Sequence, residues 1–243
     1  SETVSLRSKE FVPVDTESVS AQTMAVFKQI MNKNKLDIGI SMDGDSDRPL
    51  LVYRVYDNGK PTDEVKYVTG DILGLITVMS LKFMGVDISS VYVPVSANDA
   101  ISMVLKEKGV EHFSTKIGSP YVIAGMNESI SRHASDKAWK VCGWESNGGF
   151  LLGRDIVFNG KVLKALPTRD AVLPLVSVIM MIAKKKVTLS AFIGDLPARF
   201  THADRKKEFP VENGKAIISF LTPGEDVKKI QFPNNAEAVI VRG

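Results

Sequence analysis

Segments with helical and with alternating hydrophobic spacing follow one another along the chain. Apolar residues at helical spacing predict helices over residues 19–31, 71–84, 99–109, from 119 onward, and 170–186. Alternating or continuous apolar runs predict strands over residues 36–42, 50–56, 90–95, 110–116, 140–143, 150–158, 216–221 and 238–241. This alternation predicts an α/β fold in which mixed or parallel sheets are flanked by helices.

Turn and cap residues mark where several of these elements begin and end. Asp15-Thr16 offers a cap for the first helix, and Ser119-Pro120 places proline at the first position of another. Asn58-Gly59 and Asn159-Gly160 are dipeptides typical of tight hairpin turns. A polar stretch over residues 196–212 indicates a boundary, beyond which we expect strands.

Composition and charge exclude several classes of protein. Hydrophobic residues make up 44% of the chain and charged residues 24%, which argues against intrinsic disorder. The net charge of +3 is spread along the sequence, so we expect no nucleic-acid partner. The longest apolar run, 171–183, is shorter than the roughly 20 residues of a membrane helix, so we expect no membrane span. Cys142 is the only cysteine, which favours a reducing compartment and a cytoplasmic location.

The most informative segment is an acidic loop directly after the strand predicted at 36–42. Asp43, Asp45 and Asp47 occupy alternate positions, with Gly44 relaxing the backbone between them. Three adjacent carboxylates repel one another unless a cation joins them. Oxygen ligands without His or Cys favour Mg²⁺, Mn²⁺ or Ca²⁺ over zinc. Arg48 adds a guanidinium suited to phosphate oxygens.

Two other acidic motifs fit this loop less well. An EF-hand would need glycine at Arg48 and glutamate at Arg54, so it fails at both positions. A haloacid-dehalogenase-type phosphatase would need Thr or Val at Asp47 and is retained as a distant alternative. A solvated turn rich in aspartate is the structural alternative. Three aspartates and an arginine within six residues after an apolar strand make it the weaker interpretation.

A second polar loop reads Gly-Trp-Glu-Ser-Asn-Gly-Gly-Phe over residues 143–150. Glu145 offers two acceptor oxygens, and Asn147 both donates and accepts hydrogen bonds. Glycines allow the backbone to approach a ligand closely. The pattern suits contacts to vicinal sugar hydroxyls, but taken alone it is better explained by a β-turn with exposed polar residues.

Together the two loops resemble those of the α-D-phosphohexomutases, the phosphomannomutase/phosphoglucomutase family. Residues 43–48 are similar to that family's metal loop, Asp-Gly-Asp-x-Asp-Arg, and residues 145–149 to its sugar-recognition loop. Residues 15–17 and 169–171 also resemble stretches of the family. The similarity extends from about residue 11 to residue 197, and more weakly to the end.

This resemblance implies a two-step phosphoryl exchange that interconverts hexose 1- and 6-phosphates, with mannose favoured. Mg²⁺ would be held by Asp43, Asp45 and Asp47 and would bridge a phosphoserine of another domain. Arg48 would lie close to that phosphoryl group as the catalytic residue.

The resemblance also implies a set of substrate contacts. Glu145 and Asn147 would contact sugar hydroxyls, Lys116 would supply the basic group of the third domain, and Arg242 would belong to the phosphate-binding loop of the fourth. The small-molecule partner is therefore expected to be a hexose phosphate.

Some features of the family are not found in these residues. No serine is followed by His-Asn-Pro, the family's phosphoserine motif. We therefore expect the chain to be part of a longer mutase, inactive by itself, with the remaining domains in cis. The expected division is the end of domain 2 (1–66), domain 3 (67–187) and a partial α+β domain 4 (188–243). An Mg²⁺-dependent sugar-phosphate phosphatase and a non-catalytic sugar-phosphate-binding module are the alternatives.

Overall fold

A computed structural model describes residues 14–201, 208–222, 229–231 and 240–242. The chain divides into two compact units, Ser1–Ala203 and Asp204–Gly243, which are treated separately below.

The larger unit is built around a five-stranded sheet with the strand order β10-β7-β6-β4-β5. Its members are β4 (Ser90–Pro94), β5 (Glu111–Thr115), β6 (Val141–Trp144), β7 (Phe150–Leu152) and β10 (Leu166–Asp170). β4 pairs in parallel with β5 and β6, whereas β7 is antiparallel to β6 and β10. The sheet is therefore mixed, and the predicted fold class is confirmed.

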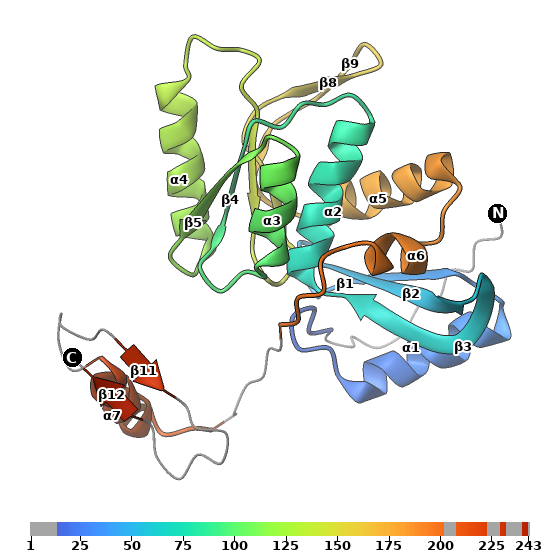
Figure 1. Ribbon diagram of the computed structural model, residues 1–243, viewed down its shortest axis with the longest axis horizontal. Helices are drawn as coiled ribbons and strands as arrows, with labels where there is room; N and C mark the ends of the chain where they lie inside the picture. The colour runs from blue at the N-terminus through green and yellow to red at the C-terminus, as the bar shows by residue number, and fades with distance from the viewer. Residues whose placement is uncertain (1–13, 202–207, 223–228, 232–239, 243) are drawn as a thin grey trace. The chain divides into compact units, whose positions relative to one another are not determined.

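Helices cover both faces of this sheet (Figure 1). α2 (Gly70–Phe83) and α3 (Ala100–Glu107) pack against the face that carries Val91 and Val93. α4 (Ser119–Arg132) packs against the opposite face, which carries Tyr92. This alternation of side chains along β4 explains why the strand is buried throughout.

A second, three-stranded antiparallel sheet has the order β1-β2-β3. Its strands are β1 (Ile38–Met42), β2 (Pro49–Asp57) and β3 (Lys60–Val68). One face packs on α1 (Ala21–Lys33), and the other on α5 (Val172–Lys185) and α6 (Leu189–Gly194). The separate hairpin of β8 (Ile156–Phe158) and β9 (Lys161–Leu163) turns at Asn159-Gly160, as the sequence predicts.

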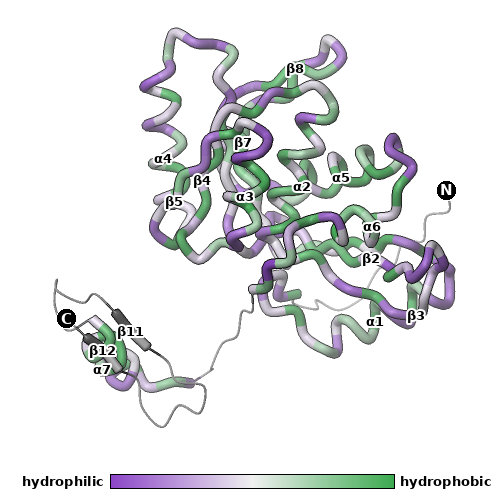
Figure 2. The backbone as a smooth tube through the Cα atoms, in the orientation of Figure 1, coloured by the Kyte–Doolittle hydropathy of each residue, from purple (hydrophilic) through white to green (hydrophobic). Residues whose placement is uncertain are grey.

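α2 belongs to the cores of both sheets. Leu75 lies in the cluster beneath the five-stranded sheet, and Ile76 lies in the cluster shared with β2 and α5. Both side chains are fully buried. Figure 2 shows the correspondingly hydrophobic colour along α2 and α5. Since one rigid helix contacts both sheets, it fixes the position of one sheet relative to the other.

The smaller unit corrects one prediction. Residues 216–221, expected to form a strand, are the second half of α7 (Val211–Leu221). A short apolar run is compatible with either element, and here the helix also includes the residues from Val211 that precede it. β11 (Lys229–Gln231) pairs antiparallel with β12 (Ile240–Arg242). Part of the strand predicted at 238–241 lies outside the described residues.

Other differences concern element ends and missed strands. α1 begins at Ala21 and is capped by Ser20, whose Oγ accepts the N–H of Thr23 at 3.0 Å. Asp15 instead accepts N–H groups in a preceding turn. β3, β10 and α6 were not predicted, and β3 is mostly exposed and lacks a clear apolar alternation.

Of the described helices, none combines the length and hydrophobicity needed to cross a bilayer.

Candidate functional site

The acidic loop connects two antiparallel strands, β1 and β2. Met42 pairs with Pro49, so residues 43–48 form the connection between them. The N–H of Asp43 donates to the carbonyl of Arg48 at 3.2 Å and closes the loop. Ser46 adopts a positive φ of 62° at the tip, a left-handed conformation that tightens the turn.

Asp43 organises the loop from inside. It is only 7% exposed, and its Oδ1 accepts the N–H groups of Asp47 at 3.2 Å and Arg48 at 3.0 Å. Burial acts to raise the pKa of Asp43, but the hydrogen bond from the Arg48 backbone and the nearby Arg48 charge outweigh it. The pKa therefore lies below its ordinary value, and the carboxylate is ionised at neutral pH.

The three aspartates converge on a single point. One carboxylate oxygen from each of Asp43, Asp45 and Asp47 lies within 4.8 Å of the others. The Arg48 guanidinium is their nearby counter-ion, with its Nε 2.5 Å from Asp43 Oδ2 and 3.4 Å from Asp47 Oδ1. Its Nη2 is 3.8 Å from Asp45 Oδ1.

This donor set fits a hard divalent cation. Asp43 Oδ2 and Asp47 Oδ1 are buried and form charge pairs with Arg48. Each carboxylate oxygen has two lone pairs, so both oxygens can also bind a further ligand. Carboxylate oxygens alone suit Mg²⁺, Mn²⁺ or Ca²⁺.

The second predicted loop, residues 145–149, turns the chain from β6 back into β7 and is named the sugar loop after the role that the family resemblance implies for it. The N–H of Gly148 donates to the carbonyl of Glu145 at 2.8 Å, and Asn147 Oδ1 accepts the N–H of Gly149 at 3.0 Å. Gly148 has φ of +88°, which favours glycine. The Asn147 carboxamide oxygen thus holds the turn.

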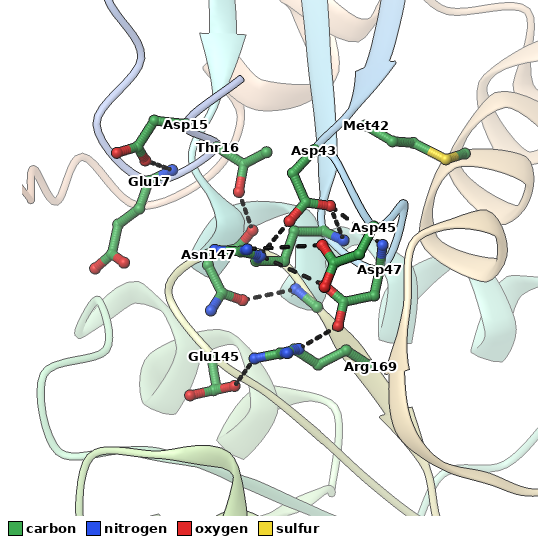
Figure 3. Close-up of polar contacts among 12 residues, drawn as sticks. Asp15, Thr16, Glu17, Met42, Asp43, Asp45, Asp47, Glu145, Asn147 and Arg169 are labelled. Atoms are coloured by element: carbon green, nitrogen blue, oxygen red, sulfur yellow. Dashed lines mark hydrogen bonds and ion pairs between the residues drawn. The ribbon is translucent and has the colours of Figure 1, made fainter. Parts of the chain in front are cut away.

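Arg169, at the end of β10, joins the two loops (Figure 3). Its Nε donates to Asp47 Oδ2 at 2.7 Å, and its Nη1 lies 3.8 Å from Glu145 Oε2. The hydrogen bond to Asp47 raises the pKa of Arg169 further, so the guanidinium stays charged. A Cβ at Gly149 would lie 2.7 Å from Arg169 Cδ, so glycine there permits this approach.

A second contact joins the sugar loop to the N-terminal segment. The hydroxyl of Thr16 donates to the carbonyl of Asn147 at 2.9 Å across 131 residues of sequence, and Thr16 is 3% exposed. Thr16 and Arg169 lie in residues 15–17 and 169–171, the two other stretches that resemble the family, and the sequence predicts no site role for either. Their positions in those stretches were the only feature of the sequence that pointed to a role at this site.

Two other predicted site residues are not joined to these loops by the described contacts. Lys116 follows β5, two strands away from β6, and its Nζ lies 5.6 Å from the ring centroid of Tyr121. Arg242 ends β12 in the smaller unit. Their roles in binding substrate stay predictions.

The arrangement places complementary groups side by side. An acidic oxygen cluster suited to a metal ion, two guanidinium groups and the Glu145 carboxylate all lie at the meeting point of the two loops. Guanidinium groups beside a cation site suit phosphate, and a neighbouring carboxylate suits hydroxyl groups.

Comparison with known proteins gives consistent matches. The family described as phosphoglucomutase/phosphomannomutase, alpha/beta/alpha domain III, matches residues 69–200, more than half of the chain. A phosphomannomutase from Salmonella muenchen is 39% identical over 221 residues, which are 90% of this chain and 41% of the relative. One from Sinorhizobium fredii is 35% identical over 215 residues, with 88% and 41% covered.

Among solved structures, a phosphoglucomutase/phosphomannomutase family protein from Burkholderia thailandensis shares the fold. Its TM-score is 0.54 at 16% identity, and the match covers 91% of this chain and 40% of that one. The chain thus spans about two fifths of the length of these proteins. Since the family match alone extends over more than half of the sequence, the chain belongs to the phosphoglucomutase/phosphomannomutase family.

Proposed function

We propose that this chain carries the metal loop and the sugar loop of an Mg²⁺-dependent phosphohexomutase that interconverts hexose 1- and 6-phosphates. The two relatives described above, 39% and 35% identical, are phosphomannomutases, which favours mannose phosphates as substrates.

The observation that carries this proposal is the bridge made by Arg169. Asp47 and Glu145 lie in loops of different sheets and far apart in sequence, yet one guanidinium contacts both. Two loops with unrelated functions would not require a side chain such as Arg169 that contacts both of them. Their direct connection supports one active site in which a phosphoryl group and a sugar are held together.

Each residue then has a defined task. Asp43, Asp45 and Asp47 would hold Mg²⁺, which supplies neutralisation of the charge on the transferring phosphoryl group. Arg48 contributes a second positive charge beside the same oxygens, and Glu145 accepts hydrogen bonds from sugar hydroxyls. Arg169 would hold Glu145 and Asp47 in a fixed relative position by contacting both. Catalysis in this scheme rests on positioning and electrostatics.

The phosphoryl donor is proposed to be a phosphoserine in other domains of the same protein. No serine of these 243 residues stands in a Ser-His-Asn-Pro context, and the relatives are more than twice as long as the matched stretch. Lys116 and Arg242 are proposed to contribute positive charge to substrate phosphate binding.

A chimera provides the direct test. This chain would replace the matching stretch of the Salmonella muenchen phosphomannomutase, and conversion of mannose 1-phosphate to mannose 6-phosphate would be followed by ³¹P NMR. We expect conversion, and a loss of at least about 100-fold for Asp45→Asn. Asp63→Asn is the matched control, because Asp63 is an exposed carboxylate of β3, and this variant should keep full activity. A folded chimera without activity would contradict the proposal.

The chain alone separates the mutase from the phosphatase alternative. Incubated with mannose 1-phosphate and Mg²⁺, it should produce neither mannose 6-phosphate nor inorganic phosphate. Release of phosphate, abolished by Asp45→Asn, would instead establish a phosphatase.

A further inference from the structure

Asp71 is a buried carboxylate with no role in the scheme above. It lies in the first turn of α2 and is only 3% exposed. Its Oδ2 accepts the N–H of Asn98 at 3.0 Å, in the loop that follows β4. The Ser146 side chain of the sugar loop lies beside this carboxylate, close enough for its hydroxyl to act to lower the pKa of Asp71. One side chain thus contacts the loops after two adjacent parallel strands, β4 and β6.

The sugar loop lies directly on the helix turn that carries Asp71. A Cβ at Gly70 would be 2.2 Å from Gly148 N and 2.3 Å from Ser146 O, so the two backbones are in contact. In the loop after β4, Asn98 Oδ1 accepts the N–H of Ala100 at 2.9 Å and so fixes the local turn. Asp71 therefore lies between two backbone segments with little room to move.

Stability alone does not favour a carboxylate at this position. Burial raises the pKa of Asp71 more than the Ser146 hydroxyl and the Asn98 N–H lower it. Oδ1 is buried and lacks a partner in full hydrogen-bond geometry among the described residues. A buried charge that is only partly compensated costs folding free energy. The carboxylate does, however, provide hydrogen-bond acceptor oxygens to both the sugar loop and the loop after β4.

We propose that Asp71 is a positioning residue that fixes the sugar loop and the loop after β4 in one geometry, through the Ser146 hydroxyl and the Asn98 N–H. Its effect on hexose phosphate binding rests on the proposed function, whereas its effect on loop order does not. Asparagine at position 71 keeps one acceptor oxygen, and the Ser146 hydroxyl can rotate to accept from the amide. Alanine offers neither contact.

Hydrogen exchange measured residue by residue by NMR on the 243-residue chain tests the effect on loop order. Asp71→Ala should accelerate exchange of the Asn98 and Gly148 amides at least tenfold, and Asp71→Asn should keep it within about threefold of wild type. Ser80→Ala is the matched control, because Ser80 is a fully buried polar residue of the same helix that bonds to Ile76. Unchanged exchange in Asp71→Ala, or equal acceleration in Ser80→Ala, would overturn the proposal.

Binding of mannose 6-phosphate, measured by calorimetry on the chimera with the same substitutions, tests the functional consequence. Asp71→Ala should weaken binding at least tenfold, and Asp71→Asn should restore it. If wild type does not bind the sugar phosphate, the proposed function fails while the exchange data still decide the role of Asp71. If Asp71→Ala binds as wild type does, the positioning role is wrong.

Discussion

Adding one methyl group at Gly70 should separate the sugar loop from α2. The Cβ of Gly70→Ala would lie 2.2 Å from the backbone nitrogen of Gly148, more than 1 Å inside an ordinary van der Waals contact. Neither partner is a flexible side-chain end, so the loop or the helix terminus must move by about that amount. The backbone of Gly70 does not have a positive φ, so the effect is steric and not one of backbone strain.

The expected magnitude follows from this displacement. Overpacking of this kind costs about 1–3 kcal/mol, which lowers Tm by roughly 2–12 °C in a chain of this size. Misplacement of a substrate-binding group by about 1 Å costs on the order of 100-fold in rate. We therefore expect Gly70→Ala to reduce mutase activity of the chimera about 100-fold while the protein remains folded.

Thermal unfolding followed by circular dichroism, together with the ³¹P NMR assay, measures both effects. Gly194→Ala in α6 is the control, because a Cβ there meets nothing within 4 Å. It should keep wild-type activity and a Tm within a few degrees of wild type. If Gly70→Ala matches wild type in both Tm and activity, the close packing of the sugar loop on α2 is refuted.

Three further predictions follow from individual side chains. Arg48→Gln removes the counter-ion of the aspartate cluster, so Mn²⁺ binding, measured by electron paramagnetic resonance, should tighten about tenfold, and weaker binding would show that Arg48 instead shapes the loop. Folded Asp71 binds its proton more tightly than the unfolded chain does, so lowering the pH removes a destabilising charge. Asp71→Asn should therefore be more stable than wild type to urea at pH 7.5, with a difference that shrinks toward pH 4; a constant or reversed difference would contradict the raised pKa. Cys142 is completely buried and its pKa is raised by burial, so a thiol reagent at pH 8 should modify it only after unfolding, and rapid labelling of the native chain would contradict this burial.

The shapes of both loops of the candidate site could be predicted from the sequence because each loop is a short continuous segment. Asp43, Asp45 and Asp47 lie in one hairpin connection, and the turn of residues 145–149 is closed by its own backbone and Asn147. Such segments need no distant partner to adopt their shape. The apolar residues of α7 show the opposite case, since a short run such as 216–221 fits a strand or a helix and local spacing does not decide.

The contacts that join the loops were not predictable from spacing. Arg169 meets Asp47 across 122 residues, and Thr16 meets Asn147 across 131. Neither arginine nor threonine carries a local pattern that specifies such a partner. Both contacts exist because two sheets are held in a fixed relation, and that relation is set by packing.

The packing that sets this relation lies in α2. Leu75 and Val78 enter the core of the five-stranded sheet, while Leu73 and Ile76 enter the core shared with β2 and α5. The N-terminus of the same helix contacts the sugar loop through Gly70. The distance between the acidic loop on one sheet and the sugar loop on the other is therefore fixed by a helix that contributes no predicted metal or substrate ligand. Truncating Leu75 or Ile76 to alanine would leave a cavity on one face of α2 or the other. Either cavity should weaken the contact between Arg169 and Asp47 before it changes the hydrogen bonds inside the two loops.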